Sequence, residues 1–314
     1  MSDSSGVPST LVATSVVRGS KQGESHGGVF LVDLASQEAR QVIDWDTMDI
    51  DWQGRGWDRG LRGIAFHEDR VYIAASDELF AYTPEFELIG SWRSPFLRHC
   101  HEIDVWDGNI FLTSTGYDSI LAFDTRREVF HWALHVETQQ FKFRGHVFDP
   151  MGEKGPLMLN KLHLNSVACR EGGMYLSGLK SGGMLLFNGK TVEMAATLPA
   201  GTHNARPFRD GVLFNDTETD QLRYCGRGEG TEDRSLQVPK YPLDDLTHRG
   251  EDDSRIARQG FARGLCELSG RVVAGGSSPS TITLYDLKES RQLMSVRLSR
   301  DIRNAIHGLE VWPW

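Results

Sequence analysis

Residues 101–123 read HEIDVWDGNIFLTSTGYDSILAF and contain one complete unit of a pattern that recurs along the chain. A short strand of alternating apolar residues is followed by a polar turn, a second apolar strand, another turn and a third strand. Long helical periodicity is nearly absent. The sequence therefore predicts an all-β protein built of repeats. The same pattern recurs over four further stretches: residues 62–82, 165–187, 203–224 and 263–285.

A sixth unit is divided between the two ends of the sequence. Residues 306–314, IHGLEVWPW, read as a first strand with nothing after it, whereas residues 11–17 and 27–45 read as later strands without a first strand. A C-terminal strand that completes the N-terminal blade would close the sheets into a ring and hide their edges. We therefore predict a six-bladed β-propeller as a single domain over residues 11–314, preceded by a disordered tail over residues 1–10.

This repeat pattern resembles that of the six-bladed β-propeller superfamily, which includes gluconolactonase-like enzymes, streptogramin lyases and NHL-type binding propellers. The resemblance covers nearly the whole chain and is carried by the repeats themselves. It implies the fold, and that fold hosts lactonases, lyases, oxygenases and pure binding modules. The activity must therefore be argued from the residues of the site.

The charge and composition of the chain argue against several kinds of partner. The formal net charge is -9, so we expect neither nucleic acid nor an anionic membrane as a partner. The first ten residues are polar, and no run of eighteen apolar residues occurs. The four cysteines stand singly, which is typical of reduced thiols. We expect a soluble, cytoplasmic protein.

Polar residues open the first strand of every unit. In a propeller these strands line the central channel, so their opening residues point toward a shared axis. Burying six polar side chains at one axis costs free energy of folding unless a ligand or an ion binds them. These positions are Arg62, His101, Asn165, His203, Arg263 and His307, with His163 two residues before Asn165.

His101, His203 and His307 recur in every second unit. Three inward imidazoles form a facial set of nitrogen ligands, and we expect them to hold a divalent metal with His163 as a fourth ligand. Fe(II) is the favoured ion, and Zn(II) and Mn(II) are alternatives. Four histidines would look like the iron site of carotenoid-cleavage oxygenases, which are seven-bladed, so only the chemistry carries over. The alternative is that these histidines are structural.

Arg62 and Arg263 each begin the sequence Arg-Gly followed by an apolar residue. A guanidinium binds a carboxylate or phosphate with two parallel hydrogen bonds, so we expect both to hold an anionic small-molecule substrate over the metal. The alternative is a structural ion pair with an acidic neighbour such as Glu267 or Asp58. Two further residues are expected to contact the substrate: Asn165 and Trp57.

Long connections alternate with short ones, and the long ones lie near residues 44–60, 131–161 and 225–259. They precede the units whose first strands carry Arg62, His163 and Arg263, so we expect them to narrow the mouth of the channel as a lid. The alternative is that they are decoration or dimer contacts that make a homo-oligomer. Aromatic walls would come from Trp52, Trp57, Phe141, Phe143 and Phe148.

Three hypotheses for the function follow. The first is a non-haem iron oxygenase or oxidase acting on a small carboxylate-bearing substrate, because all-nitrogen ligation leaves positions open for substrate and dioxygen. Glu102 would move protons in that site. The second is a zinc- or other metal-dependent hydrolase, lactonase or lyase. The third is a non-catalytic binding propeller. Motifs for phosphate-binding loops, dinucleotides, serine hydrolases and helical zinc proteases are not found.

Overall fold

The computed structural model describes residues 9–46, 60–140, 142–228, 230–250 and 258–314. The chain is an all-β, six-bladed β-propeller made of six antiparallel sheets, which confirms the predicted fold class. Most of the predicted tail and most of the insertion near residues 44–60 lie outside the described residues. Within the described part of the chain, no helix is long and apolar enough to cross a membrane.

The chain divides into two compact units. We call residues 62–218 the central unit, and residues 1–61 together with 219–314 the terminal unit. One blade, made of β17 (Thr202–Phe208), β18 (Gly211–Asp216), β19 (Gln221–Gly226) and β20 (Arg234–Gln237), has two strands in each unit.

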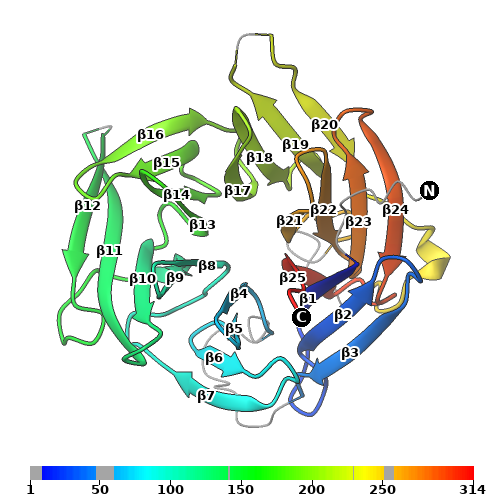
Figure 1. The fold of residues 1–314 in the computed structure, drawn as a ribbon, viewed down its shortest axis with the longest axis horizontal. Helices are drawn as coiled ribbons and strands as arrows, with labels where there is room; N and C mark the ends of the chain where they lie inside the picture. Colours follow the sequence, from blue (N-terminus) through cyan, green and yellow to red (C-terminus); the bar gives the residue numbers. More distant parts are fainter. Residues whose placement is uncertain (1–8, 47–59, 141, 229, 251–257) are drawn as a thin grey trace. The chain divides into compact units, whose positions relative to one another are not determined.

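The central unit contains three complete sheets and the first hairpin of a fourth (Figure 1). The first strands of its four blades, β4, β8, β13 and β17, lie side by side in that order. The strands are β4 (Ile64–His67), β5 (Arg70–Ala74), β6 (Leu79–Tyr82), β7 (Leu88–Trp92), β8 (Ile103–Trp106), β9 (Asn109–Ser114), β10 (Ser119–Asp124), β11 (Val129–Gln139), β12 (Lys142–Phe148), β13 (Leu164–Arg170), β14 (Gly173–Gly178), β15 (Gly183–Phe187), β16 (Val192–Thr197), β17 (Thr202–Phe208) and β18 (Gly211–Asp216).

The terminal unit holds the blade that both ends of the chain build. Strand β25 pairs with β1 antiparallel, from Leu11 opposite Val311 to Val17 opposite Asn304, so the C-terminal strand completes the N-terminal blade as predicted (Figure 1). The strands of this unit are β1 (Thr10–Val17), β2 (Gly27–Asp33), β3 (Ala39–Asp44), β19 (Gln221–Gly226), β20 (Arg234–Gln237), β21 (Leu265–Glu267), β22 (Val272–Ser277), β23 (Thr281–Asp286), β24 (Arg291–Arg297) and β25 (Asn304–Val311).

Turn chemistry explains where the hairpins reverse. Asp107 and Gly108 join β8 to β9 with φ angles of 48° and 70°. Positive φ at both central residues is the geometry of a type I′ turn, which matches the twist of the strands and favours Asp-Gly. The sheet that begins with β8 also carries a fifth strand, because residues 131–139 of the predicted insertion belong to β11 and residues 142–148 form β12.

The core consists of apolar clusters between neighbouring sheets of one unit. In the central unit, one cluster includes Tyr72 and Phe123, and a second includes Leu134 and Leu176. In the terminal unit, a third cluster joins the strands around Leu309 to those around Ile282. Burial of these side chains is the main favourable term in folding, and it fixes the first strands that carry the predicted site.

Candidate functional site

The six positions predicted to open the first strands fall into two structural groups. Arg62, His101 and Arg263 lie two residues before their strands. Asn165 and His203 lie at β-bulges in β13 and β17, and His307 lies at a bulge in β25. A bulge interrupts the alternation of a strand and redirects a side chain, and bulges are common beside functional sites.

In the central unit, the ring of His101 is fixed by two oxygen atoms. Its Nδ1 lies 2.7 Å from the carbonyl oxygen of His99 and 2.9 Å from Oγ1 of Thr115. The hydroxyl hydrogen of Thr115 is donated to the carbonyl of Leu164, so this hydroxyl accepts from the imidazole. Both partners are acceptors, and Nδ1 therefore carries the proton. In the neutral ring Nε2 is then the basic nitrogen.

His163 and His203 show the same arrangement. Nδ1 of His163 lies 3.0 Å from Oδ1 of Asn160, and Nδ1 of His203 lies 3.3 Å from the carbonyl oxygen of Gly201. Each of these oxygens accepts a hydrogen bond from the N–H at Nδ1, which leaves Nε2 as the basic nitrogen in both rings. Metal-bound histidines normally donate their second ring N–H to an oxygen in this way.

The two threonines that match between the repeats take part in this arrangement. Thr115 accepts directly from His101, as described above. Thr217, its counterpart in the next repeat but one, donates its hydroxyl to the carbonyl oxygen of Gly201 at 2.7 Å, and that carbonyl faces His203. The sequence shows the match between the two threonines, but their contacts with the histidines emerge only from the structure.

The three imidazoles of the central unit lie close together. The ring centroid of His101 is 5.4 Å from that of His163 and 6.4 Å from that of His203. Imidazoles that share a tetrahedral ion through nitrogen have centroids about 5 Å apart. The first pair already matches this spacing, and His203 stands about 1 Å too far away. Accordingly, no described group of three or more His, Cys, Asp or Glu side chains is arranged to hold a metal ion as it stands.

Glu102 is buried beside this cluster, and its carboxyl contacts two residues of β17. Its Oε1 accepts a hydrogen bond from the Asn204 amide and lies 3.5 Å from the guanidinium of Arg206. Burial raises the pKa of the Glu102 carboxyl, while Arg206 and the Asn204 hydrogen bond act in the opposite direction. The Asn204 amide is itself fixed by Asn215 at 2.9 Å. This carboxyl is therefore held in place one residue from His101.

The predicted substrate contacts differ in burial. Arg62 is fully buried, and its backbone N–H donates to the carbonyl of Ala74 at 2.7 Å. Asn165 is 1% exposed and donates its amide to the carbonyl of Thr202 at 3.3 Å. Its Oδ1 is buried and has no hydrogen-bond partner among the described residues. A buried acceptor needs a donor, so this oxygen suits a ligand or an ordered water. Trp57, with Trp52 and Phe141, lies outside the described residues.

In the terminal unit, His307 lies between two buried arginines. Its Nε2 is 3.1 Å from Nη2 of Arg18 and 3.4 Å from Nη1 of Arg263. The guanidinium of Arg263 also lies over the ring of Phe261, 4.7 Å from the centroid. Guanidinium nitrogens only donate, so Nε2 of His307 accepts from them in this arrangement. Sequence reasoning missed Arg18, which directly follows β1, the strand paired with β25.

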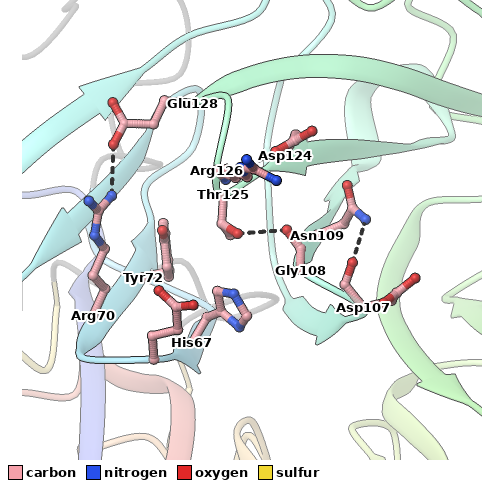
Figure 2. A pocket seen from close by; sticks show the side chains of 11 residues that line it. His67, Arg70, Tyr72, Asp107, Gly108, Asn109, Asp124, Thr125, Arg126 and Glu128 are labelled. Atoms are coloured by element: carbon pink, nitrogen blue, oxygen red, sulfur yellow. Dashed lines mark hydrogen bonds and ion pairs between the residues drawn. The ribbon is translucent and has the colours of Figure 1, made fainter.

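A separate polar pocket of about 540 Å³ is lined by the last residue of β4 and by the turn after β8 (Figure 2). Arg62 and His101 precede the same two strands, so the pocket lies at the other end of each strand. Two of its acidic side chains, those of Glu128 and Asp124, have structural partners. Glu128 pairs with Arg70 at 2.8 Å, and Asp124 accepts from the backbone N–H groups of Arg126 and Arg127. Those N–H groups hold the pKa of Asp124 below its usual value. These contacts fix hairpin turns, so the histidine cluster is the better candidate site.

Comparisons with known proteins identify the fold and nothing finer. No known protein family matches the sequence, and no curated protein matches it. A chain in a nidogen–laminin complex is 11% identical with a TM-score of 0.58, covering 96% of this chain and 97% of that one. A Bacteroides caccae protein of unknown function is 9% identical with a TM-score of 0.55, covering 96% and 98%. Apo AztD from Citrobacter koseri is 12% identical with a TM-score of 0.50, covering 93% and 82%.

Proposed function

We propose that this protein is a metal-dependent enzyme whose ion is bound by Nε2 of His101, His163 and His203. The observation that carries the proposal is the shared fixation of the three rings. Each Nδ1 faces an oxygen acceptor, which leaves Nε2 as the basic nitrogen of each ring, and the ring centroid of His101 lies 5.4 Å from that of His163 and 6.4 Å from that of His203. A movement of His203 by about 1 Å would bring its ring to the spacing of a shared ion. The prediction that His307 is a ligand is not part of this proposal, because its Nε2 accepts from Arg18 and Arg263.

The chemistry of the donor set favours Fe(II) over harder ions. Imidazole nitrogen suits Fe, Zn and Cu, whereas Mg and Ca prefer oxygen. Three imidazoles leave positions open for substrate and dioxygen, so the proposed reaction class is an oxygenase or oxidase. When bound, the ion would supply activation of dioxygen or water. A zinc-dependent hydrolase, lactonase or lyase is the second candidate, because the same donors suit Zn(II).

The surrounding residues support a small anionic substrate. Oδ1 of Asn165 is a buried acceptor for a donor group on that substrate, since it has no hydrogen-bond partner among the described residues. Arg62, buried in the same unit, is the proposed partner of a carboxylate. Glu102, whose pKa burial raises, is the proposed carrier of a proton. A cytoplasmic location belongs to the same proposal, and the four cysteines are free thiols.

The test compares metal content in three proteins purified after growth with added iron and zinc. We expect about one equivalent of metal in the wild type and at least a tenfold loss in His203→Ala. The matched control is His131→Ala, because His131 is exposed and contacts Asn109 rather than the cluster. A wild-type protein without stoichiometric metal would overturn the proposal and favour a binding propeller.

Oxygen consumption then separates the two reaction classes. An iron-loaded protein that consumes dioxygen with a small carboxylate supports the oxygenase. Stoichiometric zinc with no dependence on oxygen would overturn the oxygenase and support the hydrolase or lyase.

A further inference from the structure

A second pocket of the central unit, of about 570 Å³, has aromatic walls. Its lining comes from two neighbouring sheets, the one that begins with β8 and the one that begins with β13. Trp106 ends β8 and Arg170 ends β13, whereas His101 precedes β8, so this pocket lies at the end of the strands away from the histidine cluster. Concave sites of this volume with mostly apolar walls are typical of ligand binding. We call it the aromatic pocket.

Four aromatic rings form the walls of the aromatic pocket. The ring centroid of Trp132 on β11 lies 6.4 Å from that of Phe111 on β9 and 6.0 Å from that of Phe187 on β15. These three side chains are half-buried, whereas Trp106 is 45% exposed. Tryptophan offers a ligand both a large apolar face and one N–H donor.

The open hydrogen-bonding groups of the aromatic pocket are mainly donors. The indole N–H groups of Trp106 and Trp132 have no hydrogen-bond partner among the described residues. Arg170 uses only Nη1, which donates to the carbonyl of Cys169 at 2.7 Å and lies 3.5 Å from the carboxylate of Asp104. In the described part of the chain, Nε and Nη2 of Arg170 have no partner.

The amide oxygens of the aromatic pocket are already occupied. Oδ1 of Asn109 accepts from Nε2 of His131 at 2.8 Å, and Oδ1 of Asn188 accepts from the backbone N–H groups of Lys190 and Thr191 at 3.0 and 2.9 Å. A ligand that suits this pocket therefore offers carbonyl acceptors and few N–H donors. Among the amino acids, proline alone has a backbone carbonyl without an N–H.

The charges at the aromatic pocket add a second requirement. Arg170 lies beside Asp104, which offsets its positive charge. Glu171 is exposed, lines the pocket and makes no ion pair with any described residue. The charge left without a partner is therefore negative, and it suits a basic residue on the ligand.

We propose that the aromatic pocket binds a proline-rich segment of a partner protein with a basic residue beside its prolines. Such segments form an extended helix without internal hydrogen bonds and dock in aromatic-lined grooves. The N–H groups of Trp106, Trp132 and Arg170 would donate to its carbonyls, and Glu171 would pair with its basic residue. The inference goes beyond the proposed function, because the aromatic pocket contains none of the residues of the histidine cluster.

Fluorescence polarisation of a labelled peptide, in which an arginine precedes a run of prolines, tests this inference on the full-length protein. We expect saturable binding that is at least about tenfold tighter than that of the same peptide with alanine in place of proline, because the proline helix is preformed. A peptide of D-proline has the same composition and the opposite handedness, and it should also bind at least about tenfold more weakly. Equal binding of the L- and D-proline peptides would overturn the inference.

Substitutions of Trp106 locate the binding to the aromatic pocket. Trp106→Ala should weaken binding at least about tenfold, and Trp106→Phe, which keeps a ring and loses the N–H, by about 2- to 10-fold. The matched control is Trp314→Ala, because Trp314 is 46% exposed and does not line this pocket. The control should keep the wild-type affinity. A Trp106→Ala protein that binds as tightly as the wild type would overturn the inference.

An exchange of charges tests the role of Glu171. Glu171→Lys should weaken binding of the arginine peptide by about two- to fivefold, and a peptide with glutamate in place of arginine should regain that loss. A loss that is the same for both peptides would contradict the predicted basic residue. Indole that saturates the pocket of a protein to which no proline peptide binds would overturn the inference in favour of a small aromatic ligand.

Discussion

Two oxygen acceptors, the His99 carbonyl and the Thr115 hydroxyl, hold the proton of His101 on Nδ1 and leave Nε2 as the basic nitrogen. Thr115 donates its hydrogen to Leu164 and so presents a lone pair to Nδ1 of the imidazole. Without this acceptor, only the carbonyl of His99 would hold the proton on Nδ1. Hydrogen bonds to the second ring nitrogen set both the tautomer and the orientation of a metal-binding imidazole.

Replacing Thr115 by Val keeps the shape of the side chain and removes the hydroxyl. We expect Thr115→Val to weaken metal binding by about 10- to 100-fold, because the ring of His101 loses one of its two fixed acceptors. Competition with a chelating dye measures this affinity. Thr115→Ser keeps the hydroxyl and should restore most of the loss, which a general packing defect would not allow.

Thr125→Val is the matched control for this change. Thr125 is also buried and donates its hydroxyl to a carbonyl, that of Gly108, but it lies at the turn end of the strands. We expect its metal affinity to stay within about twofold of the wild type. Equal losses in Thr115→Val and Thr125→Val would contradict the assigned role of Thr115 and indicate a loss of fold.

At the scale of single strands, the bulges explain what the sequence could and could not predict. The period-2 pattern locates the strands, because alternation of apolar residues is a direct consequence of the pleat. The pattern cannot locate a bulge, because one extra residue can be inserted without changing the kinds of residue that the strand contains. Asn165, His203 and His307 lie at such bulges, so their direction follows from pairing rather than from parity.

Residues 131–148 illustrate a second limit of the sequence pattern. The sequence predicts a lid insertion there, whereas residues 131–139 belong to β11 and residues 142–148 form β12. The sequence departs there from the four-strand repeat, and extra length alone does not distinguish a loop from an added edge strand. Packing decides the outcome, because Leu134 and Val136 of β11 are buried against the next blade. The lid role of the insertions stays a prediction.

The hairpin of β23 and β24 offers a pH-dependent test of one element. Asp286 ends β23, accepts from the backbone N–H groups of Lys288 and Glu289, and binds the guanidinium of Arg271 through both oxygens. This guanidinium, followed by the backbone donors, holds the pKa of Asp286 well below its ordinary value. A lowered pKa in the folded state means that ionised Asp286 stabilises the fold at neutral pH. The contribution is lost as pH falls through the folded pKa.

We therefore expect Asp286→Asn to lower the Tm at pH 7 by about 1.5 °C, the shift that about 1 kcal/mol gives in a chain of 314 residues. The difference between variant and wild type should shrink as the pH is lowered from about 5 toward 2. Thermal unfolding by circular dichroism measures both. Asp69→Asn, at an exposed turn position, should leave the Tm unchanged. A difference that is constant across this pH range would contradict the assigned role of the ionised carboxylate.

At the scale of the molecule, the divided sixth unit was the strongest prediction of the fold. An isolated first strand at one end and later strands at the other are hard to place in a sandwich or a barrel, whereas a propeller uses both. The pairing of β25 with β1 confirms this. The site was less accessible to sequence reasoning, because Asn160, Gly201 and Arg18 hold or face imidazoles through contacts that the repeat pattern does not contain.

Removing β25 tests this closure. We expect a chain that ends at Arg303 to be insoluble or sensitive to protease, because β1 loses its partner and becomes an open sheet edge. Ile306 and Leu309 are at most 2% exposed and pack in the core of the terminal unit. Leu309→Ala alone should lower the free energy of unfolding by about 2–5 kcal/mol, which urea denaturation measures.

The control for this truncation is a chain that lacks only Trp314, which is 46% exposed and lies beyond the end of β25. Its urea midpoint should match that of the full chain. Adding a synthetic peptide of residues 304–314 to the truncated chain should restore protection from protease, since the missing strand pairs only through non-covalent contacts with β1. A truncated chain that unfolds at the same urea concentration as the full chain would show that β25 does not stabilise the N-terminal blade.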